Sequence, residues 1–508
     1  MNPGRIARLS AAVLLGLAGT AWAAGEAPLA DAAEEGNTAL VRTLLHAGGA
    51  DVNAAQVDGM TALHWAAYHD DAETAGLLVR AGADVDAANR YGVSPLSLAA
   101  TNGNAGLVSL LLDAGADPDA SLRGGETVLM TAARTGSLAA VTALLAEGAD
   151  PDAREARDQN ALMWAAAEGH TPIVEALIAA GADVHASLRS GFTPLFFAVR
   201  GGHVEATRTL LDAGVDVNAE LTRIKDGPDR AVNNATYRPV DDGMSPLLLA
   251  VRNGHFELAV ELIKAGADPN DQRTGFAPLH TVSWVRKPDA SDRGPWGGAG
   301  LTGLQFVRAL VAWGADVNLR LEQGRRPPHT ASGLEMEGAT AFLMAADRAD
   351  AGLMQQLLEL GADPFLPNAE LSTPLMAAAG LGTNAPDEEA GSEAEALIAT
   401  EMLLDLGADI DAVDANGDTA MHGAAYGNFP TVVGLLAASG ADSEVWSEKN
   451  AAGRTPLFIA EGFRNGLPRL SRPTIDALEL IMAREGVPTD GPRPVHIDQY
   501  SRPAQQQQ

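Results

Sequence analysis

Three histidines, His170, His203 and His255, stand at matching places in the chain and raise the question of a shared metal site. Each follows a glycine that separates the two predicted helices of one pair. Neighbouring helices pack with their axes about 8 to 10 Å apart, whereas each protein ligand lies about 2 Å from its metal. This spacing argues against a metal held between these histidines, and we expect no metal site.

The acidic run DIDAVDANGD at residues 409–418 is similar in composition to a calcium-binding loop. It lacks the alternating ligand positions and the closing glutamate of such a loop, and turn formation explains its aspartates and its glycine. The chain also has no cysteine, no nucleophile elbow, no Walker loop and no HExxH motif. We therefore expect no cofactor and no catalytic activity.

Aromatic and basic residues concentrate in irregular segments of this acidic chain. Tryptophan, tyrosine and arginine are frequent anchors of binding sites, and binding residues often lie on loops held by a rigid scaffold. The alternative is that these segments are solvated loops that pack on one another. We predict partner binding by Arg223, Tyr237, Arg238, Trp284, Arg286, Trp296, Arg325, Arg326 and His329.

The elements that would position these residues repeat along the chain. Each repeat starts with a capping residue, then Pro or an apolar residue, then Leu or a similar residue, and a glycine such as Gly181 ends its second helix. Thr193 is expected to cap its helix through its side chain. The regular copies begin at Thr61, Ser94, Thr127, Asn160 and Thr193, 33 residues apart, and further copies begin at Ser245, Ala277, Thr340, Thr373, Thr419 and Thr455.

Four insertions interrupt this period, near residues 220–242, 284–302, 321–337 and 382–395. Long loops in a compact array are usually functional or disordered. The fourth insertion is acidic and small, and we expect a solvated loop that leads into a helix from about Ser392. Trimming residues 222–240 and 322–336 is expected to leave folding nearly intact, since loop closure costs grow slowly with length.

The stretch DGMTALHWAAYHDDAETAGLLVRAGADVDAANR at residues 58–90 resembles the ankyrin-repeat family, and the resemblance extends over roughly residues 26–485. It implies an all-α solenoid of helix-turn-helix layers with β-turn fingers, about 11 full repeats after an N-terminal capping half-repeat. The capping repeat would span 26–57, the other repeats 58–485, and a disordered tail 486–508.

The resemblance also implies roles for single residues. His64, His280 and His422 occupy a place where histidines of this family have a structural role and tie neighbouring loops by hydrogen bonds. Trp65 and Trp164 share one position of the first helix, and core packing is favoured there over a platform for a ligand.

Charge and the N-terminal residues bear on partners and location. The formal net charge of -31 disfavours nucleic acid and anionic membranes as partners. Two arginines, the apolar run Leu9 to Gly19 and the small residues before Ala24 indicate a signal peptide over residues 1–23, cleaved between Ala23 and Ala24. The alternative is an uncleaved anchor. The C-terminal repeats also look like a group of exported bacterial ankyrin proteins, so we expect a periplasmic or secreted protein.

These observations favour a non-catalytic protein-interaction or scaffold protein of the cell envelope, a monomer that binds a protein partner through its repeat surface and central inserted loops. Two alternatives remain. One is an enzyme with an active site built from the inserted loops at 220–340, and the other is a cation-binding or purely structural solenoid. A pocket of titratable groups with shifted pKa values would favour the enzyme, whereas a groove lined by Tyr, Trp and Arg would favour binding.

Overall fold

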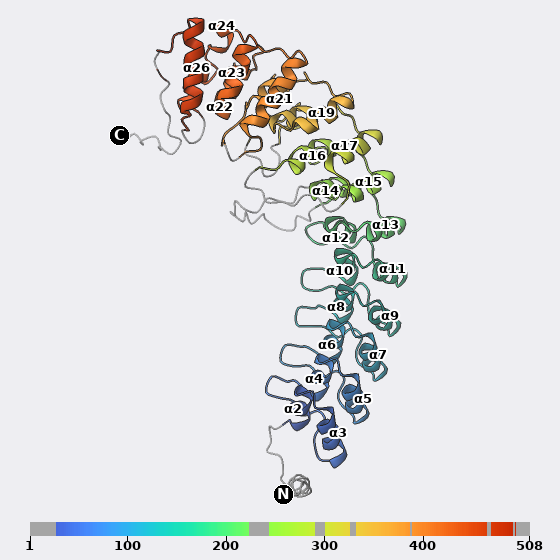
Figure 1. The fold of residues 1–508 in the computed structure, drawn as a ribbon. Coiled ribbons are helices and arrows are strands. Elements are labelled where there is room, and N and C mark those ends of the chain that lie inside the picture. Colours follow the sequence, from blue (N-terminus) through green and yellow to red (C-terminus); the bar gives the residue numbers. More distant parts are fainter. Residues whose placement is uncertain are drawn as a thin grey trace, which may run out of the picture. The chain divides into compact units, whose positions relative to one another are not determined.

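The computed structural model describes residues 27–222, 243–289, 300–325, 332–386, 389–464, 469–490 and 493. These residues form helices joined by turns, with no strand beyond two isolated bridges. The chain divides into unit 1, which is Met1–Val215 with Arg223–Arg230, and unit 2, which is Asp216–Thr222 with Ala231–Gln508. The predicted all-α stack of helix pairs is confirmed (Figure 1).

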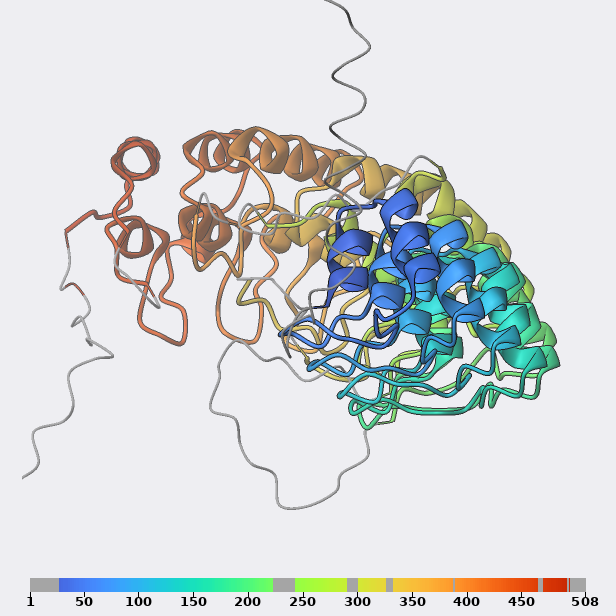
Figure 2. The same cartoon turned by 90° about the horizontal axis from the view of Figure 1, so that it is seen from below.

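The described part of unit 1 is a regular stack of helix pairs. First helices pack on first helices and second helices on second helices, as Figure 2 shows from below. Leucines of the first helices, such as Leu63, Leu96 and Leu129, are 1% exposed and form the core between layers. The pairs are α2 (Pro28–Glu34) and α3 (Thr38–Ala47), α4 (Ala62–Tyr68) and α5 (Ala72–Arg80), α6 (Pro95–Thr101) and α7 (Ala105–Asp113), α8 (Val128–Thr135) and α9 (Leu138–Ala146), α10 (Ala161–Glu168) and α11 (Thr171–Ala179), and α12 (Pro194–Gly201) and α13 (Val204–Asp212).

Unit 2 continues the pattern with less regular pairs. The first helices vary in length from 5 to 9 residues, and α24 (Ser443–Trp446) is a single added turn. The pairs are α14 (Pro246–Arg252) and α15 (Phe256–Lys264), α16 (Pro278–Arg286) and α17 (Gly303–Ala312), α18 (Ala341–Asp347) and α19 (Ala351–Glu359), α20 (Pro374–Ala378) and α21 (Glu393–Asp405), α22 (Ala420–Gly427) and α23 (Pro430–Ala438), and α25 (Pro456–Ala460) and α26 (Arg472–Glu485).

Most first helices begin at the predicted capping residue. Thr127, for example, accepts a hydrogen bond from the third amide of α8 at 3.2 Å, and Ser392 forms a capping box at the start of α21, as predicted. Thr193 is different, because its Oγ1 has no hydrogen-bond partner in the part of the chain that the structure describes. The prediction that the Thr193 side chain caps its helix is therefore wrong. Pro194, with its preset φ, occupies the first helical position there.

Helices end at glycines in the left-handed region, as predicted. Gly181 has φ of +91° and no neighbour where a Cβ would stand, whereas Gly169 has φ of +75° and lies under an imidazole ring. A Cβ on Gly169 would clash with Nδ1 of His203. The same histidine donates from Nε2 to the carbonyl of Ala167 at 2.9 Å. His203 therefore joins two layers, which is a structural role.

The finger turns, which link the second helix of one pair to the first helix of the next, are tied by acidic and amide side chains. Asp86 Oδ1 accepts from the backbone N–H of Asp117 in the following finger at 2.9 Å, and Asn218 accepts from Asp268 in unit 2 at 2.9 Å. In the run 409–418, Asp411 accepts from the next finger in the same way, at 2.8 Å. The prediction that this run forms a turn is confirmed, and many acidic residues of the chain hold successive repeats in register.

The histidines at the helix starts also connect fingers. His64 Nε2 donates to the carbonyl of Val93 at 2.9 Å, and His280 Nε2 donates to Leu319 at 3.1 Å. Burial lowers the pKa of His280 and of His422 to about 4, which keeps both rings neutral at physiological pH. The predicted role of tying neighbouring loops is confirmed for His64 and His280. Nε2 of His422 has no hydrogen-bond partner among the described residues, and its Nδ1 lies 3.1 Å from Oγ1 of Thr419 in the same repeat.

Candidate functional site

Three insertions meet in unit 2 around the buried side chain of Arg348. Its Nη2 donates to Oδ1 of Asp289 at 2.6 Å, and both side chains are 5% exposed. The same Oδ1 accepts from the backbone N–H of Ala390 at 3.1 Å, and beside it Ser332 donates to Asp347 at 2.9 Å. Because Asp289, Ser332 and Ala390 belong to the second, third and fourth insertions, these five residues, the insertion cluster, hold the three segments together.

The fourth insertion is packed into unit 2. Pro386 is buried, and the carbonyl of Gly382 accepts from the backbone N–H of Gly333 at 2.6 Å. Glu389 accepts from two backbone amides of its own loop at 2.7 and 2.8 Å, and burial raises the pKa of this carboxyl. The prediction of a solvated loop is therefore wrong. The contacts of this loop with the third insertion could not be seen from its polar composition.

The third insertion contributes to the core as well. Leu334 is 4% exposed and Met336 is 1% exposed. Trimming residues 322–336 would remove both side chains together with the hydrogen bond from Ser332 to Asp347. The expectation that this trimming leaves folding nearly intact does not hold, because the segment buries apolar surface.

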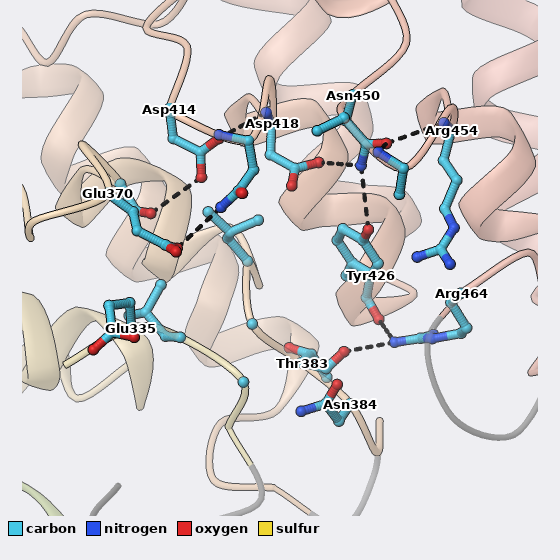
Figure 3. A pocket seen from close by; sticks show the side chains of 18 residues that line it. Glu335, Glu370, Thr383, Asn384, Asp414, Asp418, Tyr426, Asn450, Arg454 and Arg464 are labelled. Atoms are coloured by element: carbon cyan, nitrogen blue, oxygen red, sulfur yellow. Dashed lines mark hydrogen bonds between the residues drawn. The ribbon is translucent and has the colours of Figure 1, made fainter. Parts of the chain in front are cut away.

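A cavity of about 410 Å³ opens where the third and fourth insertions face the finger turns of unit 2. We call it the finger cavity. It is lined by the third insertion, the fourth insertion, three finger turns, α22 and the segment after α25. Its polar lining is shown in Figure 3 and includes Glu335, Glu370, Thr383, Asn384, Asp414, Asp418, Tyr426, Asn450, Arg454 and Arg464.

One wall of the finger cavity is acidic and is fixed by turn hydrogen bonds. Asp414 Oδ1 accepts from the backbone N–H of Asn416 and of Asp418, both at 2.8 Å, and its Oδ2 accepts from Ser372 at 3.1 Å. Glu370 accepts from the Asn416 side chain at 3.0 Å (Figure 3). These bonds give the carboxylates fixed positions before any ligand binds.

Asp418 and Tyr426 continue this wall toward α22. Asn450 donates from Nδ2 to Asp418 Oδ1 at 2.8 Å, and the same nitrogen lies 3.4 Å from the Tyr426 hydroxyl. Burial raises the pKa of Asp418 to about 6 and also raises the pKa of Tyr426. The acidic wall therefore changes charge within the physiological range at one position.

The opposite wall carries Arg464, which is only 5% exposed. Its Nη2 donates to the backbone carbonyls of Thr383 at 2.7 Å and of Tyr426 at 2.5 Å, and its guanidinium lies 5.7 Å from the Tyr426 ring. Burial lowers the pKa of Arg464. Its Nε and Nη1 have no acceptor among the residues that the structure describes. In Figure 3 the side chain of Arg454 extends from the neighbouring finger turn toward Arg464.

Unit 1 presents a second candidate site on its first helices. Tyr68, Arg134 and Arg200 are exposed and stand two repeat lengths apart, on α4, α8 and α12. Trp65 lies edge-on to Tyr68 with ring centroids 5.6 Å apart, and the Arg134 guanidinium lies 5.8 Å from the Trp164 ring. We call these five residues the aromatic–arginine face. Both tryptophans are half-buried, so the favoured core role accounts for only part of each side chain.

Comparison with known proteins agrees with this architecture. A model of three ankyrin repeats matches residues 29–121, 77–155 and 129–220, and a model of one ankyrin repeat matches residues 242–274. The chain belongs to the ankyrin-repeat family. Ankyrin repeats generally mediate protein–protein interaction, and proteins of this family are typically non-catalytic.

Curated relatives share part of this ankyrin chain. "Ankyrin repeat and SOCS box protein 16" of Mus musculus is 34% identical over 239 residues, 42% of this chain and 47% of that protein. "Neurogenic locus notch homolog protein 1" is 28% identical over 235 residues in Xenopus tropicalis and 30% identical over 234 residues in Homo sapiens. Each match covers 43% of this chain, and 8% and 7% of those two proteins. The chain therefore spans less than half the length of these relatives.

The ankyrin fold places three of the predicted partner-binding residues in intramolecular contacts. Trp284 is 9% exposed and packs edge-on against Phe276 with centroids 5.0 Å apart. Arg286 forms a two-pronged ion pair with Asp350 at 2.7 and 3.1 Å, and Arg325 donates to a backbone carbonyl at 3.3 Å. These three do not line the finger cavity. The other predicted residues, Arg223, Tyr237, Arg238, Trp296, Arg326 and His329, lie outside the described residues, as do Ala23 and Ala24 at the predicted cleavage site.

The residues of the finger cavity were not predicted from the sequence. Asp414 and Asp418 were assigned to turn formation, which is correct, and their shared cavity depends on segments far apart in the chain. One signal points to Arg464: the last repeat is interrupted between α25 and α26, where residues 461–471 replace the usual short turn. The described residues include no helix long and apolar enough to cross a membrane and no group of three or more His, Asp or Glu placed to hold a metal ion.

Proposed function

We propose that this ankyrin-repeat chain is a non-catalytic scaffold of the cell envelope that binds a protein partner through the aromatic–arginine face of unit 1. The observation that supports it is the row of Tyr68, Arg134 and Arg200, with Trp65 and Trp164 beside it. Tryptophan, tyrosine and arginine dominate the energetics of protein interfaces. A stack of repeats holds such residues on a stiff surface, so that little conformational entropy is lost on binding.

The test compares two arginines of the same helix pair. Arg200 lies on α12 at the proposed face, whereas Arg208 lies on the second helix α13 and is bonded to Glu205 at 2.7 Å. The partner is first captured from the envelope fraction on the immobilised chain and identified, and its affinity is then measured by calorimetry. Arg200→Ala is expected to weaken binding roughly tenfold or more, as an interface hot spot does. Arg208→Ala serves as the matched control.

Thermal melting of both variants shows whether either change disturbs the fold. If the Arg200→Ala and Arg208→Ala variants are both folded and bind the partner with equal affinity, the partner does not bind at this face. A second variant, Tyr68→Ala, samples α4 at the other end of the row and should weaken the same complex.

The central insertions remain part of the proposal for partner binding. Arg223, Tyr237 and Arg238 are of the side-chain types that anchor interfaces, and they lie in an otherwise acidic chain. Since Trp284, Arg286 and Arg325 stabilise unit 2, the test of this proposal is a triple alanine variant of Arg223, Tyr237 and Arg238. Weaker partner binding with an unchanged melt is the expected result, and full binding would limit the partner to the repeats.

The finger cavity supplies the observation that favours the second candidate function, an enzyme. Its titratable groups converge, and the pKa values of Asp418 and Tyr426 are raised, as is common in active sites. However, Asp414 and Asp418 are hydrogen-bonded within and between finger turns, and ion-pair and hydrogen-bond networks of this kind also shift pKa values. Of the residues that line the cavity, only Gly333, Leu334 and Glu335 belong to the segment 220–340 where an active site was considered.

We further propose that the chain is exported by a signal peptide of residues 1–23. The support is the order of basic, apolar and small residues before Ala24. N-terminal sequencing of the native protein from cell fractions tests the proposal. A first residue of Ala24 outside the cytoplasm is expected, and an intact Met1 in the cytosol would refute it.

A further inference from the structure

We propose that the finger cavity binds a ligand that carries a carboxylate and a cationic group, as the C-terminal residue of a peptide ending in Arg or Lys does. The carboxylate is held by Arg464 on one wall, and the cation faces Glu370, Asp414 and Asp418 on the other. This inference does not depend on the proposed function, because the aromatic–arginine face belongs to unit 1 and the finger cavity to unit 2.

The first argument is the incomplete hydrogen bonding of Arg464. Native proteins satisfy nearly all of their buried polar atoms, and a charged group gains more from an acceptor than a neutral one. Arg464 is 5% exposed, and two of its three nitrogens, Nε and Nη1, have no acceptor within the described ranges. Nη2 is fixed by the carbonyls of Thr383 and Tyr426, so the guanidinium is held in place at the cavity wall. An anionic oxygen that enters the cavity would complete the coordination of this group.

The second argument is the distribution of charge around the cavity. Acidic side chains of two finger turns, Glu370, Asp414 and Asp418, occupy one side, and Arg454 and Arg464 stand on the other (Figure 3). A simple anion would be repelled by the acidic wall, and a simple cation would leave the Arg464 donors unsatisfied. A ligand with both charges matches both walls, which is the electrostatic complementarity that gives specificity.

The third argument is size and rigidity. A volume of about 410 Å³ lies within the range of sites for small ligands, roughly 300 to 1,000 Å³. The carboxylates of Asp414 and Asp418 are held by hydrogen bonds of 2.8 Å, so little side-chain ordering is needed on binding. A cavity of this volume is suited to the end of a peptide chain, and capture of a terminal carboxylate is a known mode of peptide recognition.

The experiment measures binding of fluorescein-labelled Gly-Ser-Gly-Arg to the full chain by fluorescence anisotropy. Three peptides are compared: the free acid, its C-terminal amide, and a free acid that ends in Leu. The amide and the Leu peptide are each expected to bind roughly ten- to a hundredfold more weakly, as loss of a charge-assisted hydrogen bond predicts. Free arginine and inorganic phosphate are added as competitors. If free arginine competes at concentrations similar to those of the peptide, the natural ligand is a free amino acid. If free arginine does not compete, the natural ligand is the end of a peptide chain.

Variants connect the binding to the two walls. Arg464→Lys keeps the charge but loses donors, and it should remove the preference for the free acid over the amide. Glu370→Gln keeps an acceptor for Asn416 and should remove the preference for Arg over Leu. Arg472→Lys, at the exposed start of α26, is the matched control. If Arg464→Lys fails to fold, the Glu370→Gln variant and the three peptides still decide the question.

Three results would overturn the proposal. One is equal affinity for the free acid and the amide. Another is a dissociation constant weaker than about 1 mM for every peptide, which would leave a cavity filled by water alone. The third is equally strong competition by phosphate, which would make the cavity a general anion site.

Discussion

Asp347→Asn is expected to stabilise the protein at neutral pH and to leave its stability nearly unchanged at acidic pH. Asp347 ends α18 and accepts from Ser332 at 2.9 Å, and the amide oxygen of Asn can accept the same hydrogen bond. Burial raises the pKa of Asp347 from 3.8 to about 7, although Arg348 and the bond from Ser332 act in the opposite direction. The folded protein therefore prefers the protonated carboxyl, and ionisation of this group costs stability.

The pH window follows from the two pKa values. Well below pH 3.8 the carboxyl is protonated in the folded and the unfolded chain, so Asp347 carries no penalty. As the pH rises from 3.8 to about 7, the unfolded chain ionises first and stability falls. At about 1.4 kcal/mol for each pH unit, the largest possible loss in the free energy of unfolding is about 4 kcal/mol. Because the side chain is only half-buried, we expect about 2 kcal/mol.

The assay is urea unfolding of wild type and Asp347→Asn at pH 4 to 8, followed by tryptophan fluorescence. The difference between the two proteins at each pH cancels the contribution of other titrating groups. Asp405→Asn, at an exposed position on α21, is the matched control. A difference for Asp347→Asn that stays constant from pH 4 to pH 8 would refute the reasoning, because the folded protein would then bind no extra proton.

Two further predictions compare matched positions of unit 1. Gly169→Ala and Gly181→Ala each place an L residue in the left-handed region at a cost of about 1 to 2 kcal/mol. Gly169→Ala should cost at least about 1 kcal/mol more, because its Cβ displaces the His203 ring and its hydrogen bond, and equal thermal midpoints would contradict this. Thr127→Ala should cost about 1 kcal/mol through the lost cap, whereas Thr193→Ala should cost less. Denaturant melts that reverse this order would show that Thr193 caps its helix in solution.

The repeat architecture could be predicted because its determinants are local. Glycine ends, helix starts and finger aspartates all act within one repeat or between neighbours, so a periodic sequence displays them directly. Thr193 shows the limit of this reasoning: the residue type is right, but the orientation of its hydroxyl depends on packing that the motif does not encode. Trp65 and Trp164 show the same limit. Their equal positions in the repeat predicted where they lie in the first helix, but did not predict that each side chain is half-exposed.

The candidate sites depend on contacts that no periodicity describes. Arg348 meets Asp289 across an insertion, and Arg464 reaches the carbonyl of Thr383 from the last repeat. In the sequence, each of these residues is one charged side chain in an irregular segment. The insertions were expected to display Trp and Arg side chains to a partner, and their described parts bury Trp284 and close one side of a cavity. A regular ankyrin array offers a surface, and by interrupting the array this chain adds a half-open cavity to it.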